Sequence, residues 1–164
     1  MPLGTKYKFI YMANTYTQIH IQTVFAVQDR QSLIKNEWKD DLYKYITGII
    51  QNHEHKVLQI NGMADHLHIL IGMRPTQSLS DLMKIVKQGS SIWLNEKYFK
   101  NEKFSWQAGF GAFSYAKSDV QNVINYIKNQ EKHHKLVSFQ DEYLNLLNEF
   151  NIDFDARYIL KSIL

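Results

Sequence analysis

The chain has 164 residues, of which 45% are hydrophobic and 21% are charged, so it is long enough and apolar enough to bury the core of one domain. This composition excludes a chain that is mainly disordered. Because the sequence has no cysteine, it can form neither a disulfide nor a thiolate metal site nor a cysteine nucleophile. Any metal ligand must therefore be a histidine, a carboxylate, an amide or a water molecule.

The net charge of +3 is small, but it is unevenly distributed along the chain. Residues 1–136 carry 17 lysines and arginines against 11 aspartates and glutamates, whereas residues 137–164 carry 2 against 5. A basic body permits a polyanion as a partner. No apolar run approaches the roughly 20 residues that span a bilayer, so we expect a soluble, cytoplasmic protein with no membrane partner.

The first half of the chain predicts a strand, a helix and two more strands. Residues 1–14 are expected to be an extension outside the fold. Alternating apolar and polar residues predict a strand over 16–27, and apolar residues at steps of three and four predict a helix over 32–53. Residues 56–63 and 66–73 are then predicted to be two strands joined by a hairpin.

The second half predicts helix, strand and helix. Ser78, with an acidic residue three positions later, is typical of the start of a helix. Residues 104–116, which contain aromatic residues and glycines, predict a fourth strand. An apolar stripe predicts a third helix over 118–133, and residues 139–150 predict a short acidic helix.

The predicted order β-α-β-β-α-β is that of the ferredoxin-like, or RRM-like, α+β fold. This fold has an antiparallel sheet with helices on one face, and here extra C-terminal helices would follow. We expect a single domain over residues 15–136 and an acidic, helical C-terminal tail over 137–164.

Two histidines in the fourth predicted segment are the strongest local signal for chemistry. His66 and His68 alternate on one strand, so both point to the same face with Cα atoms about 6.5 to 7 Å apart. Two imidazoles placed in this way can share one metal ion. The alternative is an ordinary pair of half-exposed strand histidines. A third ligand and a nucleophile are therefore needed to distinguish a catalytic metal site from such a pair.

The third predicted helix offers both groups. Tyr126 and Gln130 are four residues apart, so they share one face beside the apolar stripe and can reach over the sheet. The alternatives are a half-buried packing tyrosine and a solvated glutamine. We expect the other five histidines to be structural or surface residues: His20, His53, His55, His133 and His134. Of these, His133 lies on the Tyr126 side of its helix and is the one most suited to contact a substrate.

Four blocks of sequence follow one another at characteristic spacings: Asp-His-Leu-His-Ile-Leu-Ile at 65–71, the Ser-Leu-Ser-Asp to Gly-Ser-Ser segment at 78–91, Trp-Gln-Ala-Gly-Phe-Gly-Ala-Phe-Ser at 106–114, and Tyr-Ile-Lys-Asn-Gln-Glu-Lys-His-His at 126–134. Together they resemble the TnpA-type single-tyrosine HUH transposases of small bacterial insertion sequences, a group with relatives associated with repeated extragenic palindromes. The tail after residue 134 lies outside these blocks.

The resemblance implies a ferredoxin-like dimer that cuts and rejoins single-stranded DNA at hairpin-marked element ends through a 5′-phosphotyrosine. Tyr126 matches the nucleophile, His66 and His68 match the metal-binding pair, and Gln130 matches the third ligand. The expected cofactor is Mg²⁺ or Mn²⁺, with no nucleotide cofactor. In such dimers the tyrosine helix of one subunit can complete the site of the other. Tyr115 adds a second tyrosine near the nucleophile.

Contacts to DNA are expected from basic residues and from aromatic residues that can stack on bases. The candidates are Lys84, Lys87, Ser90, Trp106, Phe110, Lys128, Lys132 and His133. Two other functions remain open from the sequence. One is a domesticated nuclease that processes chromosomal palindromic repeats, and the other is a non-catalytic, sheet-based nucleic-acid-binding module.

Overall fold

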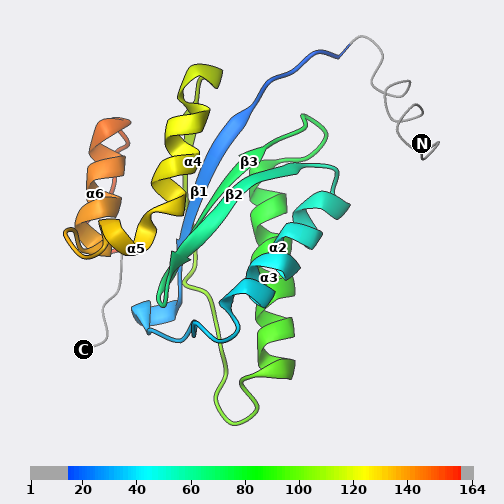
Figure 1. The fold of residues 1–164 in the computed structure, drawn as a ribbon, viewed down its shortest axis with the longest axis vertical. Coiled ribbons are helices and arrows are strands. Elements are labelled where there is room, and N and C mark those ends of the chain that lie inside the picture. The colour runs from blue at the N-terminus through cyan, green and yellow to red at the C-terminus, as the bar shows by residue number, and fades with distance from the viewer. Residues whose placement is uncertain (1–14, 160–164) are drawn as a thin grey trace.

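The computed structural model describes residues 15–159. In this part of the chain, four strands form one antiparallel sheet with helices packed on both of its faces (Figure 1). The predicted extension, residues 1–14, and the end of the predicted tail, residues 160–164, lie outside the described residues. None of the helices within 15–159 is both long enough and apolar enough to cross a membrane.

The strands of the sheet lie in the order β2-β3-β1-β4, and each neighbouring pair is antiparallel. They are β1 (His20–Ala26), β2 (Lys56–Met63), β3 (His66–Gly72) and β4 (Gly111–Tyr115). This order, with one helix between β1 and β2 and one between β3 and β4, is that of a ferredoxin-like fold. The predicted α+β fold class is therefore confirmed.

Helices and short 3-10 turns, labelled η, complete the described part of the fold. They are η1 (Gln28–Arg30), α2 (Lys39–Asn52), α3 (Leu79–Lys97), η2 (Lys117–Asp119), α4 (Val120–Lys128), α5 (Gln130–His133) and α6 (Phe139–Glu149). Figure 1 shows α2 and α3 on one face of the sheet, and α4, α5 and α6 on the other. The C-terminal helices thus enclose the sheet from the side that the ferredoxin-like core leaves open.

The two faces of β3 are buried against different helices. Leu67, Ile69 and Ile71 point toward α2 and α3 and belong to the larger core. The residues between them point the other way, because successive side chains of a strand alternate between faces. On that second face, Leu70 packs against Val123 and Ile127 of α4.

The C-terminal segment packs on the sheet as part of the fold. Phe139, Leu146 and Leu147 of α6 are buried against Val24 of β1 and Phe113 of β4. The predicted domain boundary at residue 136 therefore does not separate a detached tail from the body. Burial of these apolar side chains holds α6 over the second face of the sheet.

Three predicted elements begin later than their residue pattern indicates. The first strand begins at residue 20 and not at 16, and the first helix begins at residue 39 and not at 32. Before this helix, the backbone N–H of Ile34 donates to the Ala64 carbonyl in the turn between β2 and β3 at 2.9 Å, so this segment is bonded to the hairpin and not to a helical turn. The fourth strand begins at residue 111 and not at 104. Before it, Trp106 forms an isolated antiparallel bridge with Val27, the residue that follows β1, and Gly109 adopts a φ of 84°.

The predicted third helix is divided into α4 and α5 at Asn129, where ψ is 21°. The side-chain amide of Asn61 in β2 donates hydrogen bonds to the carbonyls of Ile127 and Lys128, at 3.0 and 3.1 Å. Such a cap satisfies carbonyls that the last turn of a helix leaves without a partner. The break places Gln130 at the first turn of α5.

The hairpin that carries the histidine pair depends on the glycine at position 62. A Cβ atom there would lie 2.1 Å from the backbone oxygen of His66, in the strand that Gly62 pairs with. We expect Gly62→Ala to lower the free energy of unfolding by about 2 kcal/mol or more, since the backbone must shift. In the control Gly48→Ala, on helix α2, the new atom meets nothing within 4 Å, so a gain of about 0.5–1 kcal/mol is expected. Urea unfolding measures both, and equal stabilities would contradict the prediction.

Candidate active site

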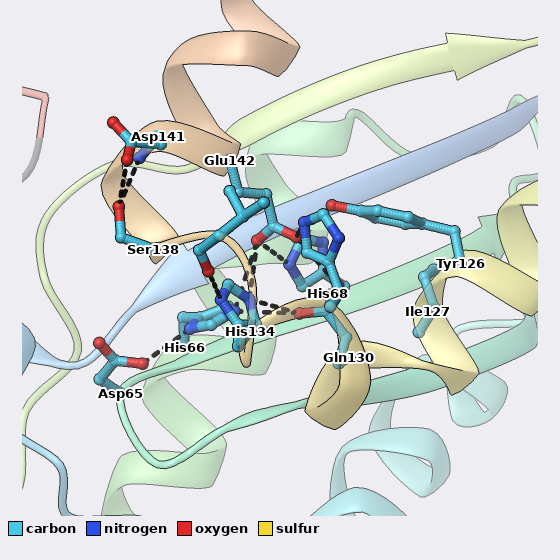
Figure 2. A network of polar contacts seen from close by, with 12 residues as sticks. Asp65, His66, His68, Tyr126, Ile127, Gln130, His134, Ser138, Asp141 and Glu142 are labelled. Atoms are coloured by element: carbon cyan, nitrogen blue, oxygen red, sulfur yellow. Dashed lines mark hydrogen bonds and ion pairs between the residues drawn. The ribbon is translucent and has the colours of Figure 1, made fainter.

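The four residues singled out for chemistry converge on the second face of the sheet (Figure 2). The rings of His66 and His68 have centroids 5.2 Å apart, and both side chains are fully buried. Gln130 Oε1 lies 3.2 Å from His66 Nε2, and the ring of Tyr126 lies 5.8 Å from that of His68. The structure therefore brings together a histidine pair, a candidate third ligand and a candidate nucleophile.

These side chains are held by neighbouring backbone elements. In the sheet, His66 and His68 pair with Ala26 and Val24 of β1, so both imidazoles stand on a central strand. Helix α4 is positioned by its contacts with Leu70, and this places Tyr126 over the same strand. Tyr126, His66 and His68 thus lie at one site within the described chain.

A carboxylate that the sequence analysis did not identify lies at the centre of the site. Glu142 of α6 is only 2% exposed, and its Oε1 lies 2.9 Å from His68 Nε2, 3.2 Å from His134 Nε2 and 3.6 Å from His66 Nε2. Its sequence position carried one usable signal. It lies three residues after Phe139 and four before Leu146, on the buried face of α6. An acidic residue in an apolar stripe needs a buried partner.

The second oxygen of Glu142 faces Tyr126. Its Oε2 accepts a short hydrogen bond from the Tyr126 hydroxyl and another, 3.0 Å long, from Gln130 Nε2. His133 Nε2 lies 3.1 Å from the same oxygen, within ion-pair distance but without the geometry of a hydrogen bond. The predicted place of His133 on the tyrosine side of the site agrees with this contact.

His134 was expected to be a structural or surface residue, and the structure places its side chain in the cluster. Its Nε2 lies 3.0 Å from Gln130 Oε1, and its ring lies 4.7 Å from that of His66. Phe139 stacks on His66 with ring centroids 3.7 Å apart and so covers the histidine pair from the α6 side. His66, His68, His134 and Glu142 together form a cluster that could hold a metal ion.

Each of the three histidines of the cluster is oriented by an oxygen on the side of its ring that faces away from the cluster. Each Nδ1 lies at hydrogen-bond distance from an oxygen that can only accept: Asp65 Oδ1 at 2.7 Å for His66, Gln22 Oε1 at 2.8 Å for His68, and the Val137 carbonyl at 2.9 Å for His134. A proton on each Nδ1 satisfies these oxygens, and each Nε2 then faces the cluster. Histidines that ligate metals have this outer arrangement.

Burial and charge shift the titration of the site. Burial lowers the pKa of His68 to about 4, and Glu142 only partly offsets this. Burial alone would raise the pKa of Glu142, but hydrogen bonds with His134 and His68 outweigh it and hold that pKa far below its usual range. Burial, with the adjacent charge of Glu142, raises the pKa of the Tyr126 phenol. Burial lowers the pKa of His134, but its contact with Glu142 reverses the sign, so the net shift is upward.

Several residues expected to contact DNA lie elsewhere. Ser90 and Trp106 are buried in the α3 side of the core, where the indole Nε1 donates a hydrogen bond of 2.9 Å to the Ser90 hydroxyl. Neither can reach a base in this structure, and both expectations are corrected. Lys87 Nζ donates to the carbonyls of Gln107 and Gly109 at 2.5 and 2.6 Å, so it holds the loop before β4.

The remaining candidates divide between the two faces. Lys128 and Lys132 are exposed on α4 and α5, the helices that carry Tyr126 and Gln130. Lys84 is exposed on α3, on the opposite face of the sheet, and Phe110 is half-buried against the larger core. A cleft of about 600 Å³ opens beside Tyr126, between α4, β4 and α6, and includes Asn122 and Asn145 in its lining. It provides the open approach to the tyrosine.

Comparisons with known proteins identify the family of the chain. Residues 15–130 match the model of a family described as IS200-like transposases. The chain is 24% identical over 131 residues to the transposases of insertion sequence element IS200 from Salmonella typhimurium and Salmonella typhi, covering 76% of this chain and 85% of each relative. The resemblance found in the sequence is thereby confirmed.

Two solved structures share the fold. A candidate transposase from Deinococcus radiodurans is 17% identical, with a TM-score of 0.59 over 71% of this chain and 94% of its own. A REP-associated tyrosine transposase bound to a REP hairpin is 14% identical, with a TM-score of 0.58 over 76% of this chain and 73% of its own. At these identities the likeness establishes the fold.

Proposed function

The chain belongs to the IS200-like transposase family, and from this premise we propose that it cleaves and rejoins single-stranded DNA at hairpin-marked ends. One observation carries the proposal. Tyr126, His66, His68 and Gln130 come from separate parts of the chain, and they meet at one site. A non-catalytic binding module would have no need for a buried histidine pair beside a tyrosine.

The chemical role of Tyr126 is nucleophilic attack on a DNA phosphate. Its hydroxyl oxygen bonds to phosphorus, the phosphorus–O3′ bond breaks, the phenol loses its proton, and the released 3′ oxygen gains one. The product is a 5′-phosphotyrosine and a free 3′-hydroxyl. Because a phosphodiester replaces a phosphodiester, a different 3′-hydroxyl can reverse the step and join new ends without a nucleotide cofactor.

The donor set fits a divalent metal, and His66, His68 and Gln130 are the residues that we expected to hold it. When bound, such an ion would polarise the scissile phosphate and stabilise the charge that develops on it. Mg²⁺ and Mn²⁺ are the expected ions, and the imidazole ligands favour Mn²⁺. Burial lowers the pKa of His68 to about 4, so this imidazole is neutral near pH 7 and its lone pair is available for this role.

A DNA partner fits the surface around the tyrosine. Tyr126 lines the cleft between α4, β4 and α6, and Lys128 and Lys132 are exposed on α4 and α5, the helices that carry Tyr126 and Gln130. A protein with the same fold was solved bound to a REP hairpin, and this supports a hairpin as the DNA element that this chain recognises. Whether the substrate is a mobile-element end or a chromosomal repeat depends on the DNA that flanks the gene.

The proposal is tested with a labelled single-stranded oligonucleotide that contains the hairpin from DNA flanking the gene. With Mn²⁺ present, we expect a covalent protein–DNA adduct that survives denaturing electrophoresis. A chelator should remove the activity, and a matched oligonucleotide with a scrambled stem should form far less adduct. Adduct formation that persists in the double variant His66→Ala and His68→Ala would refute the proposed site.

The arrangement of Tyr126 beside the histidines of its own chain predicts catalysis within one subunit. We expect that a mixture of the Tyr126→Phe and His68→Ala proteins forms no more adduct than either variant alone. In a dimer with exchanged tyrosine helices, random pairing makes about half of the dimers mixed, each with one of its two sites intact, so activity would return to about a quarter of wild type. The measurement is adduct formation after co-refolding, and such restoration would show that tyrosines are exchanged.

A further inference from the structure

We propose that the C-terminal segment is itself part of the metal centre: His134 and Glu142 ligate the same ion as His66, His68 and Gln130, and Glu142 links this ion to the Tyr126 hydroxyl. Binding of the ion would then hold helix α6 on the sheet. This inference rests on the metal-dependent function proposed above. It concerns residues beyond position 130, where the match to the family model ends.

The first argument is the spacing of the donor atoms. Ligands about 2.1 Å from one ion lie about 3.0 to 3.4 Å from each other when they subtend angles between 90° and 110°. Glu142 Oε1 lies 2.9 and 3.2 Å from the Nε2 atoms of His68 and His134. Gln130 Oε1 lies 3.2 and 3.0 Å from the Nε2 atoms of His66 and His134. The longest of these contacts, His66 Nε2 to Glu142 Oε1, is 3.6 Å.

The second argument is the direction of the Nε2 atoms. The Nδ1 atoms of His66 and His68 lie 2.7 and 2.8 Å from Asp65 Oδ1 and Gln22 Oε1, so Nδ1 of each ring has an acceptor for its proton. Each Nε2 faces the oxygens of Gln130 and Glu142. A proton on Nε2 makes each of these contacts a hydrogen bond, and a divalent ion would take the place of that proton while the ring keeps its proton on Nδ1.

The third argument is that the two carboxylate oxygens of Glu142 have different partners. Oε1 faces the imidazoles, whereas Oε2 accepts hydrogen bonds from the Tyr126 hydroxyl and from Gln130 Nε2. One oxygen can therefore ligate the ion while the other orients the nucleophile. This makes Glu142 a positioning residue for Tyr126 as well as a ligand.

The coupling to α6 follows from the position of these two ligands. Glu142 lies on α6 itself, and His134 precedes that helix, with its Nδ1 at 2.9 Å from the Val137 carbonyl. An ion bound by residues of β3, α5 and α6 joins three elements that are otherwise held by apolar packing and hydrogen bonds. Ligand binding to the folded form stabilises the parts that it joins.

The experiment measures Mn²⁺ affinity by calorimetry on the full chain, without DNA. We expect Glu142→Gln to weaken Mn²⁺ binding at least tenfold, and His134→Ala to do the same. Glu149→Gln is the matched control, because it removes the same charge from an exposed position on the same helix. Its affinity should stay within twofold of wild type. Hydrogen exchange should slow across α6 when Mn²⁺ is added to wild type but not when it is added to Glu142→Gln.

The outcomes separate this inference from the proposed function. If Glu142→Gln and His134→Ala both bind Mn²⁺ as wild type does, the inference is overturned, and the function stands if wild type still forms the adduct. If Glu142→Gln forms more adduct at unchanged Mn²⁺ affinity, Glu142 obstructs the site and the inference is also overturned. Failure of wild type to bind Mn²⁺ would overturn both. Circular dichroism verifies that each variant is folded. If Glu142→Gln does not fold, the Mn²⁺ affinity of His134→Ala decides whether the C-terminal segment ligates the ion.

Discussion

Replacing Tyr126 with phenylalanine is expected to abolish the covalent protein–DNA adduct, lowering its rate of formation by at least about a thousandfold. The change removes one oxygen, the atom that would bond to phosphorus, and leaves the ring that packs beside His68. The fold should be retained, because the loss of one partly buried hydrogen bond costs about 1 kcal/mol. Denaturing electrophoresis with the labelled hairpin oligonucleotide measures the effect.

Tyr115 supplies the matched control for this substitution. It is the second tyrosine near the site, and its hydroxyl accepts a hydrogen bond of 2.8 Å from Gln22, the residue behind His68. Burial raises the pKa of Tyr115 to about 12, so this phenol is protonated at neutral pH. We expect Tyr115→Phe to slow adduct formation by no more than about tenfold, since it supports His68 only through Gln22. Adduct formation by Tyr126→Phe, or its complete loss in Tyr115→Phe, would assign the nucleophile to Tyr115.

Leu70→Ala is expected to weaken both stability and activity. The side chain is fully buried and packs against Val123 and Ile127, the residues that hold α4 on the sheet. Its truncation should lower the free energy of unfolding by about 2–5 kcal/mol. Because α4 carries Tyr126, we also expect adduct formation to fall by about tenfold or more in protein that is still folded.

The neighbouring residue on the same strand distinguishes these two effects. Ile71 is equally buried, but it points to the opposite face and belongs to the core beneath α2 and α3. Ile71→Ala should cost a similar free energy of unfolding while changing adduct formation much less. Urea unfolding and adduct rates, measured at a temperature where both variants are folded, test the pair. Equal losses of activity would show that α4 is not positioned through Leu70.

Local patterns in the sequence were sufficient to predict most helices and strands and to select four residues of the candidate site. His66 and His68 share a face because a strand alternates, and Tyr126 with Gln130 share a face because a helix repeats. The break at Asn129 does not separate them, since the capping by Asn61 keeps α5 close to the end of α4. The fourth strand begins later than its pattern indicates, after Gly109, whose φ of 84° departs from that of a strand.

The errors concern which face a residue occupies. Ser90 and Trp106 are residue types that often contact nucleic acids. In the structure, the loop before β4 folds back on α3, and the Trp106 indole is buried against the Ser90 hydroxyl. Lys87 is likewise used to bind the carbonyls of that loop. The identity of a single residue does not show which partner its side chain will contact in the folded protein.

By itself, the sequence determined the ferredoxin-like order of elements, the family, and the histidine pair with its tyrosine and glutamine, because each of these depends on short-range periodicity or on ordered blocks. Only the tertiary structure decided that Glu142 and His134 join them. Glu142 is separated from His68 by 74 positions and meets it only when apolar residues of α6 pack on the sheet. A contact over that separation leaves no periodic trace in the chain, since it is set by the burial of Phe139 and Leu146 and not by the acid itself.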